Sequence, residues 1–196
     1  MSAIEIFKNC MKKESEAILS NLDNFSSEVD KAVELIMSAS GKVVVTGVGK
    51  SGHIGQKIAA SMASTGTPAF FMHATEGVHG DLGMITKNDV VIMISNSGET
   101  KEVINLLPSL NEIGCKTISI TKSHDSTLAK ASSVSLAYSY ECECDHLHLA
   151  PTISSTLTLA VGDSLCVALC EIKNFTKESF HLYHPGGSLG KMLESK

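Results

Sequence analysis

After Gly41 the chain alternates short apolar runs with longer segments of helical spacing, and this alternation restricts the fold more than any other feature. The first run, Lys42 to Thr46, reads KVVVT and leads into glycines, which is typical of a buried strand entering a turn. Alternation of this kind implies right-handed βαβ crossovers. It predicts an α/β fold, a doubly wound parallel sheet of about five strands with helices on both faces. Strands are predicted at 42–46, 69–72, 89–95, 117–121 and 134–137, and helices at 52–64, 101–113 and 125–131.

Helical segments flank this alternating core on both sides. Residues 1–39 are predicted to form two extra N-terminal helices, with Ser26 or Ser27 capping the second. Residues 152–175 are predicted to form one long apolar helix, and the tail after it carries the motif HPGGSLGK. No internal repeat or linker interrupts the chain, so we expect a single domain over 1–196 with its core at 40–196.

Composition and charge exclude several classes of protein. The net charge is −5 and the Lys and Arg residues are not clustered, which argues against nucleic acid as a partner. The N-terminal segment mixes charges into its apolar residues, unlike a signal peptide, and no apolar run approaches the roughly 20 residues that span a bilayer. The six cysteines are scattered, and several lie in apolar stretches as reduced thiols do. We therefore expect a cytoplasmic protein with no membrane partner.

Two loops that each follow a strand and begin a helix are candidates for a binding site, because ligands of such sheets bind at the carboxyl ends of the strands. The first, GVGKSGHIG, contains G-x-G-x-x-G, which alone is weak evidence for dinucleotide binding. It lacks both Walker spacing and the acidic residue expected about 20 residues further on. A glycine turn for close packing is the structural alternative. A binding role is favoured because Lys50 and Ser51 would project toward the strand ends.

The second loop, SNSGET, is predicted to bind a phosphate. Hydroxyls of Ser95, Ser97 and Thr100 can donate to phosphate oxygens, and Gly98 lets the backbone approach. The helix that follows would aim free N–H groups at the same point. The alternative is a capping box, since Ser97 and Thr100 would cap that helix in any case. Three hydroxyls and a glycine exceed what capping needs, so the whole loop, Asn96 included, is predicted to hold the phosphate.

Two other polar segments carry weaker signals. His73 and His79, in HATEGVHGD, lie near a strand end with acids between them. A lone histidine is usually structural, but this arrangement modestly favours a functional site. The segment 141–148, ECECDHLH, would place two cysteines and two histidines on one face of an extended chain. Such a set can bind zinc, but it lacks the C-x-x-C spacing of common zinc sites, so a structural metal is disfavoured.

The motifs taken together resemble the sugar isomerase (SIS) domain of arabinose-5-phosphate isomerases, a flavodoxin-like fold. The resemblance covers roughly residues 40–195 and implies an isomerase that interconverts D-ribulose 5-phosphate and D-arabinose 5-phosphate, supplying the acid Kdo for lipopolysaccharide or capsule. It also implies a homotetramer with shared active sites, no cofactor, and a short form without the paired CBS module. The matching motifs are GVGKSGHIG, ASTGTPAFF, HGDLGM, SNSGET, LAPTISSTLTLAVGD and HPGGSLGK.

The resemblance also implies roles for individual residues. Glu143 is the leading proton-shuttling base, and Glu102 is the alternative. His184 would open the sugar ring or relay a proton, and it can reach a neighbouring subunit's site from its place near the C-terminus. Lys50 would stabilise the enediolate. The residues implied in substrate binding are Ser51, Gly66, Thr67, His73, His79, Ser95, Asn96, Ser97, Gly98 and Thr100.

Two departures from the family and three alternatives remain at this point. After Glu143 the family usually shows Ala-Cys-Pro, whereas this chain has Cys144-Asp145-His146. Many relatives also continue into the paired CBS module, which this chain is expected to lack. A non-catalytic phosphosugar sensor would need the phosphate loop but not four catalytic groups. An isomerase for another sugar phosphate would differ only in side-chain geometry. A dinucleotide-dependent oxidoreductase is disfavoured by the missing ribose-binding acid.

Overall fold

All five predicted strands form and pair into one parallel sheet. The structure is a computed structural model and describes residues 1–185. The spatial order is β2-β1-β3-β4-β5, and every neighbouring pair is parallel. This is the flavodoxin-like doubly wound order, so the predicted fold class is confirmed. The strands are β1 (Val43–Gly47), β2 (Ala69–His73), β3 (Val90–Ile94), β4 (Lys116–Thr121) and β5 (Val134–Ala137).

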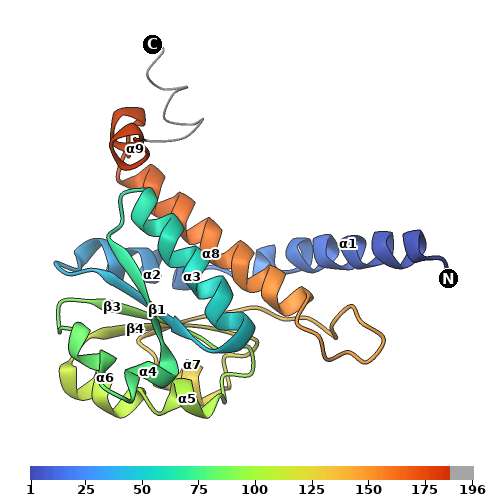
Figure 1. Cartoon of the computed structure of the whole chain (residues 1–196), viewed down its shortest axis with the longest axis horizontal. Coiled ribbons are helices and arrows are strands. Elements are labelled where there is room, and N and C mark those ends of the chain that lie inside the picture. Colours follow the sequence, from blue (N-terminus) through green and yellow to red (C-terminus); the bar gives the residue numbers. More distant parts are fainter. Residues whose placement is uncertain (186–196) are drawn as a thin grey trace.

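Helices cover both faces of the sheet (Figure 1). The side chains of β1 alternate between the two cores. Val43 and Val45 pack on one face, and Val44 packs on the other. Because this parallel strand is buried on both sides, KVVVT is a continuous apolar run instead of an alternating one. The first face carries α2 (Ser27–Ser38), α3 (Gly49–Ser64) and α8 (Ile153–Ile172); the second carries α4 (Ala74–Gly77), α5 (Lys101–Ile104), α6 (Leu107–Ile113) and α7 (Thr127–Ala131).

The N-terminal helix α1 (Ala3–Ser20) extends away from the sheet (Figure 1). A capping box fixes its start, since the Ser2 hydroxyl accepts from the Glu5 N–H and the Glu5 carboxylate accepts from the Ser2 N–H. Its outer apolar side chains, Ile4, Phe7 and Met11 among them, are exposed. A short 3-10 turn, Leu22–Asn24, joins it to α2, so both predicted N-terminal helices are present.

Helix α8 runs the length of the domain beside α3 and ends near α9 (Lys177–Tyr183) at the opposite end (Figure 1). By length and composition alone α8 is apolar enough to cross a membrane. In this fold, however, Leu157, Leu165 and Leu169 are buried in the core against the sheet. It is therefore the core helix that the sequence predicted at 152–175, ending at Ile172.

Two predictions of local structure were wrong. The helix predicted at 101–113 is interrupted at 105–106, because Pro108 has no N–H for the carbonyl four residues earlier and its ring crowds that turn. The helix predicted from residue 52 begins instead at Gly49. Helix α9 was not predicted at all.

The segment 141–148 is an irregular loop, not an extended chain, so its cysteines and histidines do not share one face. Asp145 organises this loop. Its carboxylate accepts backbone hydrogen bonds from Leu147 at 3.0 Å, Leu149 at 3.0 Å and Ala150 at 2.8 Å. The carboxylate of Asp145 is therefore an internal acceptor that fixes the course of the loop before α8.

Candidate active site

A cavity of about 280 Å3 opens at the carboxyl ends of β1 and β3, where the winding of the sheet reverses. Three segments far apart in the sequence line it: the loop after β1, the loop after β3, and the β5–α8 loop with the first turns of α8. The polar side chains that line it include Lys50, Ser51, Asn96, Tyr140, Glu143 and His148. The cavity thus brings together four of the predicted site residues, Lys50, Ser51, Asn96 and Glu143.

A second hollow of about 250 Å3 lies between α1, α2 and α8, but its lining is apolar. Ile18, Phe25 and Leu157 are typical of it. It offers a phosphate no cation and almost no hydrogen-bond donor. The polar cavity lined by Lys50, Ser51, Asn96 and Glu143 is the candidate active site, because it brings these predicted residues together.

The first turn of α3 carries Lys50 and Ser51 into the cavity. Lys50 is exposed and Ser51 half-buried, so both side chains are accessible to a ligand. The alternative reading of this loop, a glycine turn that allows close packing, is also correct. A side chain at Gly52 would place its Cβ 3.2 Å from the carbonyl oxygen of Gly47. The turn is tight so that α3 can pack close to β1, and this close packing aims the two polar residues at the strand ends.

The SNSGET loop is held in shape by its own hydroxyls. Ser95 is buried, and its Oγ lies 2.7 Å from Thr100 Oγ1 and accepts a hydrogen bond from the Gly98 N–H at 3.0 Å. Ser97 Oγ accepts from the Glu99 N–H at 3.1 Å. Within residues 1–185 Thr100 makes no side-chain capping bond to α5, so capping does not account for the three hydroxyls of this loop. The hydroxyls shape a rigid loop, and the exposed Ser97 faces solvent.

Gly98 is the position in this loop that only glycine can occupy. Its φ is +68°, a conformation that side chains rarely adopt. A Cβ there would also collide with Ser126 Oγ and Cβ. Ser126 belongs to the segment before α7, where it caps that helix by accepting from the Ala129 N–H at 3.2 Å. The loop after β3 is therefore pressed against the loop after β4.

A hydrogen-bond network connects the SNSGET loop to Glu143. Asn96 Nδ2 donates to Tyr140 Oη at 2.8 Å, and Tyr140 in turn donates to Glu143 Oε1 at 3.0 Å. On the other side of the amide, Tyr138 donates to Asn96 Oδ1 at 3.1 Å and bonds to the Thr158 hydroxyl at 2.9 Å. Both groups of the Asn96 side chain are thus fixed, and the amide cannot rotate without breaking the network.

Glu143 is only 6% exposed, and its two carboxylate oxygens have different surroundings. Oε2 accepts from the Thr152 N–H at 2.9 Å, the Thr152 hydroxyl at 3.0 Å and the Ser154 N–H at 3.3 Å. Among the described residues, Tyr140 is the one donor to Oε1. Burial alone would raise the pKa of Glu143, but the hydrogen bonds from Ser154 and Thr152 outweigh burial and hold that pKa below its ordinary value. Glu143 is therefore a carboxylate at neutral pH, and Oε1 is the oxygen with acceptor capacity to spare.

Besides Ser95, Ser97, Gly98 and Thr100 of the SNSGET loop, three of the predicted residues lie at the same edge of the sheet but do not line the cavity. Glu102 is exposed in the first turn of α5. His73 ends the edge strand β2, opposite Gly47, and its Nδ1 accepts from the Thr75 N–H at 3.3 Å. His79 is exposed after α4. Of the two glutamates, the structure of one chain places only Glu143 with Lys50.

Gly66, Thr67 and His184 lie at the opposite end of the domain. Gly66 and Thr67 precede β2, at the amino ends of the strands, and Lys173 Nζ donates to the Gly66 carbonyl at 3.1 Å and the Thr67 hydroxyl at 2.7 Å. The 20 residues of α8 separate this region from the cavity by about 30 Å. The structure of one chain therefore does not bring these residues to the cavity.

His184 belongs to the same remote cluster. It stacks on Phe180 with a centroid distance of 3.9 Å, and its Nδ1 lies 2.8 Å from the Phe180 carbonyl oxygen. The neighbouring Tyr183 stacks on Phe175, which in turn contacts Gly66. The rest of the HPGGSLGK motif, residues 186–191, lies outside the described residues.

Sequence reasoning missed three residues at the cavity edge. Tyr140 holds Glu143 and Asn96 as described. Lys122 follows β4 directly, and its Nζ lies 4.0 Å from the centroid of the Tyr140 ring. His148 lines the cavity, and its Nδ1 lies 3.0 Å from the Glu143 carbonyl oxygen. A signal was available for Lys122 and Tyr140, because each comes one to three residues after a predicted strand, at the edge where ligands bind. For His148 there was none.

This sheet order, with a polar cavity at the switch point, defines a doubly wound α/β domain built to bind a small polar ligand. The SIS domain model matches residues 35–168, more than half of the chain. The chain therefore belongs to the SIS domain family.

Its relatives include proteins that are named as isomerases. Arabinose 5-phosphate isomerase KdsD of Pseudomonas aeruginosa is 51% identical over 92% of this chain and 55% of its own length. Arabinose 5-phosphate isomerase KpsF of Escherichia coli O6:H1 is 48% identical over 92% of this chain and 56% of its own length. The chain thus spans about half the length of the curated relatives it matches.

A solved structure from E. coli CFT073 matches most of this chain. It is the complex of that strain's protein c3406 with arabinose 5-phosphate, 49% identical to this chain, with a TM-score of 0.91. The match covers 94% of this chain and 100% of the other. The fold seen here is therefore that of a SIS domain that binds arabinose 5-phosphate in that relative.

Proposed function

We propose that this chain is an aldose–ketose isomerase that interconverts D-ribulose 5-phosphate and D-arabinose 5-phosphate. The observation that carries the proposal is the meeting of Lys50 and Glu143 in one cavity beside the SNSGET loop. A cation, a carboxylate and a phosphate-binding loop are the groups that enediol chemistry on a sugar phosphate needs. The names of the relatives support the same substrate pair.

The phosphate end of the sugar would be held by the SNSGET loop. The loop is rigid because Ser95, Thr100 and Gly98 bond to one another, and it leaves the Ser97 hydroxyl exposed. Lys122 adds a positive charge at the next strand end. A phosphate fixed there positions the reacting carbons of the sugar toward Lys50 and Glu143.

Glu143 would move the proton between adjacent carbons. In the aldose direction its Oε1 takes the proton from C2 of arabinose 5-phosphate, which leaves an enediolate with its negative charge on O1. A proton then passes from O2 to O1, and C1 accepts the proton back from Glu143, so that C2 becomes the carbonyl of ribulose 5-phosphate. The same steps run in reverse for the other direction. Lys50 would stabilise the negative oxygen of the enediolate. Oε1 is the better atom for this transfer because Oε2 already accepts three hydrogen bonds.

His184 would complete the site from a neighbouring subunit, in a homotetramer with shared active sites. Support comes from the clustering of His184, Gly66 and Thr67 at the end of the domain far from the cavity. Three residues that the family resemblance assigns to the substrate or the chemistry thus gather in one place. Paired chains running in opposite directions would bring this cluster of each chain to the cavity of its partner.

The compartment and the cofactor requirement follow from the same proposal. Proton transfer through an enediol needs no redox cofactor, and the chain's own acid, base and cation suffice. The substrate is a small sugar phosphate, as the cavity of about 280 Å3 accommodates. We propose that the enzyme acts in the cytoplasm and supplies Kdo biosynthesis.

Isomerisation of arabinose 5-phosphate in D2O, followed by NMR, tests the catalytic proposal. We expect wild-type protein to convert the sugar and to exchange the C2 proton, Glu143→Gln to lose about 10²- to 10⁴-fold in kcat, and Glu102→Gln to lose less. Near-wild-type turnover by Glu143→Gln would remove Glu143 as the base. Absence of conversion by wild-type protein that still binds the sugar phosphate would favour a phosphosugar sensor instead.

Mixed oligomers test the shared site. Glu143→Gln and His184→Ala chains, each inactive alone, would be unfolded together and refolded as an equal mixture. If each site takes Glu143 from one chain and His184 from another, about a quarter of the sites are intact and activity returns to about that fraction. If both residues act within one chain, the mixture stays inactive.

A further inference from the structure

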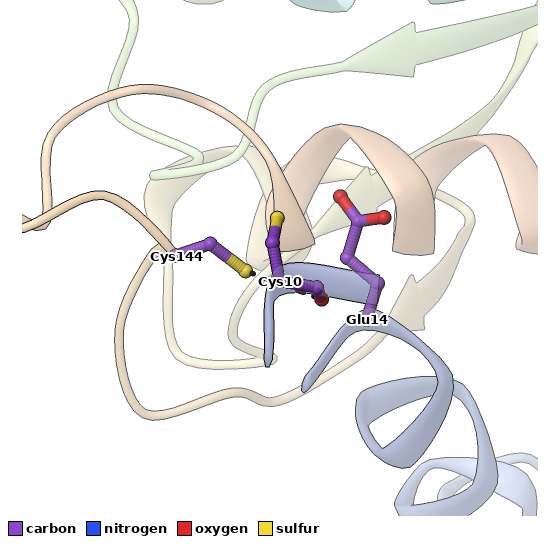
Figure 2. A group of neighbouring side chains, drawn as sticks. All are labelled: Cys10, Glu14 and Cys144. Carbon is purple, nitrogen blue, oxygen red and sulfur yellow. Dashed lines mark hydrogen bonds between the residues drawn. The ribbon is translucent and has the colours of Figure 1, made fainter. Parts of the chain in front are cut away.

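Cys10, Glu14 and Cys144 form a compact group outside the cavity (Figure 2). Cys10 and Glu14 are one turn apart on α1, and Cys144 belongs to the β5–α8 loop. The two thiol sulfurs and a Glu14 carboxylate oxygen all lie within 4.8 Å of one another. All three side chains are half-buried where α1 meets the loop. Among residues 1–185 no other group of three such side chains comes this close.

The contact between the two segments is weak in the absence of a ligand. Cys144 Sγ donates to the Cys10 carbonyl oxygen at 3.7 Å, as the dashed line in Figure 2 shows. Two sulfur atoms and one carboxylate oxygen are ligands that favour a thiophilic cation over a hard cation such as Mg²⁺.

The spacing fits a tetrahedral cation. Zinc binds thiolate sulfur at about 2.3 Å and carboxylate oxygen at about 2.0–2.2 Å, which places neighbouring ligand atoms about 3.5–3.8 Å apart. The ligand atoms, which lie within 4.8 Å of one another, must therefore approach by about 1.3 Å at most. Residues four apart on a helix project to the same side, so side-chain rotation of Cys10 and Glu14 supplies it without moving α1.

We propose that Cys10, Glu14 and Cys144 bind one thiophilic divalent cation, Zn²⁺ above all, with water as the fourth ligand. Two sulfurs and one oxygen in tetrahedral geometry select zinc over calcium or magnesium. The site lies outside the cavity and supplies no step of the isomerisation proposed above. The proposal of a cation site is therefore independent of the proposed isomerase activity, and the two are tested separately.

The bound cation would tie α1 to the loop that carries Glu143. Cys144 follows Glu143 directly, and its N–H donates to Thr152 Oγ1 at 2.9 Å. The same Thr152 hydroxyl donates to Glu143 Oε2 at 3.0 Å. A restraint on Cys144 is thus transmitted through one residue to the carboxylate. Helix α1, which extends away from the sheet, becomes fixed to the active-site loop.

Cobalt is the probe for this site, because Co²⁺ reports its ligands by colour. Full-length protein, reduced and stripped of metal with a chelator, would be titrated with Co²⁺ and then with Zn²⁺. We expect one equivalent of Co²⁺ to give tetrahedral d–d bands and a thiolate-to-cobalt charge-transfer band, both abolished by one equivalent of Zn²⁺. Zinc should also raise the melting temperature.

Variants decide which residues bind. Cys10→Ser and Cys144→Ser should each halve the charge-transfer band and weaken zinc binding by more than the roughly 10- to 100-fold that loss of an outer-shell partner costs. Glu14→Gln should weaken binding while leaving the charge-transfer band intact, and as a helix-surface change it keeps the fold. Cys142→Ser is the matched control, a half-buried cysteine in the same loop that is not part of the group, and it should bind as wild type.

Three results would overturn the proposal. The first is the absence of a stoichiometric cobalt spectrum in reduced wild-type protein. The second is a spectrum without charge transfer, which would indicate adventitious binding at histidines. The third is a spectrum that survives in both Cys10→Ser and Cys144→Ser, or that is lost in Cys142→Ser.

Discussion

The hydroxyl of Tyr140 donates to Glu143 Oε1, and its removal should shift the pH dependence of the isomerase activity proposed above. Tyr140→Phe deletes the donor to Glu143 Oε1 at 3.0 Å and the acceptor of Asn96 Nδ2 at 2.8 Å, and leaves the ring in place. A hydrogen bond to a charged group contributes about 1.5–3 kcal/mol. Tyr140 is half-buried, so water can replace part of the lost hydrogen bond in the variant. We therefore take the lower end of this range, about 1.5 kcal/mol, as the free energy lost.

That loss corresponds to a rise of about one unit in the pKa of Glu143, since one unit is about 1.36 kcal/mol. Glu143 has a lowered pKa in the folded chain, so its carboxylate stabilises the fold above the ordinary carboxyl pKa, and this stabilisation is lost as the pH falls through the lowered value. The variant should therefore melt about 3–5 °C lower at neutral pH. The difference should shrink in acid, where both proteins carry a protonated Glu143.

The acidic limb of kcat/KM reports ionisation of the free enzyme's base and should move up by about one pH unit in Tyr140→Phe. The ionisation of the substrate's phosphate is common to both enzymes and cancels in the comparison. Tyr138→Phe is the control, because its hydroxyl bonds to Asn96 and Thr158 but not to Glu143. An acidic limb at the same pH in wild type and both variants would refute the reasoning.

Two further predictions follow from single contacts. Asp89→Asn should lower the free energy of unfolding by about 3 kcal/mol at neutral pH, because the buried carboxylate accepts from the Lys42 N–H at 2.8 Å and the Thr86 N–H at 2.7 Å. Burial raises the pKa of Asp89, but these hydrogen bonds lower it more. The difference in unfolding free energy between wild type and Asp89→Asn should therefore shrink as the pH falls through that lowered pKa, which denaturant melts at several pH values would measure. A difference that stays constant with pH would contradict this. Gly98→Ala should raise KM for the sugar phosphate about tenfold or more, whereas Gly114→Ala, also at positive φ but with open space around it, should cost only about 1–2 kcal/mol of stability. Equal KM values for the two alanine variants would show that the phosphate loop tolerates the displacement.

The fold could be predicted because local pattern and tertiary structure agree in this chain. Three consecutive valines occur in KVVVT because Val44 packs on one face of the sheet while Val43 and Val45 pack on the other. Alternation of strands and helices then leaves few topologies, since crossovers are right-handed. The break before Pro108 shows the limit of this reasoning. The proline was visible in the sequence, but the apolar spacing on both sides of it continued the helical period.

The site was predictable only in part, because motifs report residue types while the cavity depends on how loops approach one another. Lys50 and Asn96 follow strands and lie where strand ends meet. Tyr140 and Lys122 occupy equivalent positions, yet a tyrosine or a lysine after a strand has no spacing that marks it. His148 reaches the cavity through a loop whose course depends on the carboxylate of Asp145, an interaction that no sequence period reveals.

The hydrogen bonds that orient Glu143 have a chemical cost that the rest of the site must offset. Each donor to the carboxylate stabilises the charged form, so the donors from Tyr140, Thr152 and Ser154 make Glu143 a weaker base as well as a better positioned one. A proton on carbon beside a carbonyl is far less acidic than a carboxylic acid, so weakening the base raises the barrier to enediolate formation. The site must offset this higher barrier by stabilising the negative charge that develops on the sugar oxygen as the proton leaves carbon. Lys50 is the cation in the cavity that can supply this stabilisation, so catalysis should depend more steeply on Lys50 than on the strength of the base.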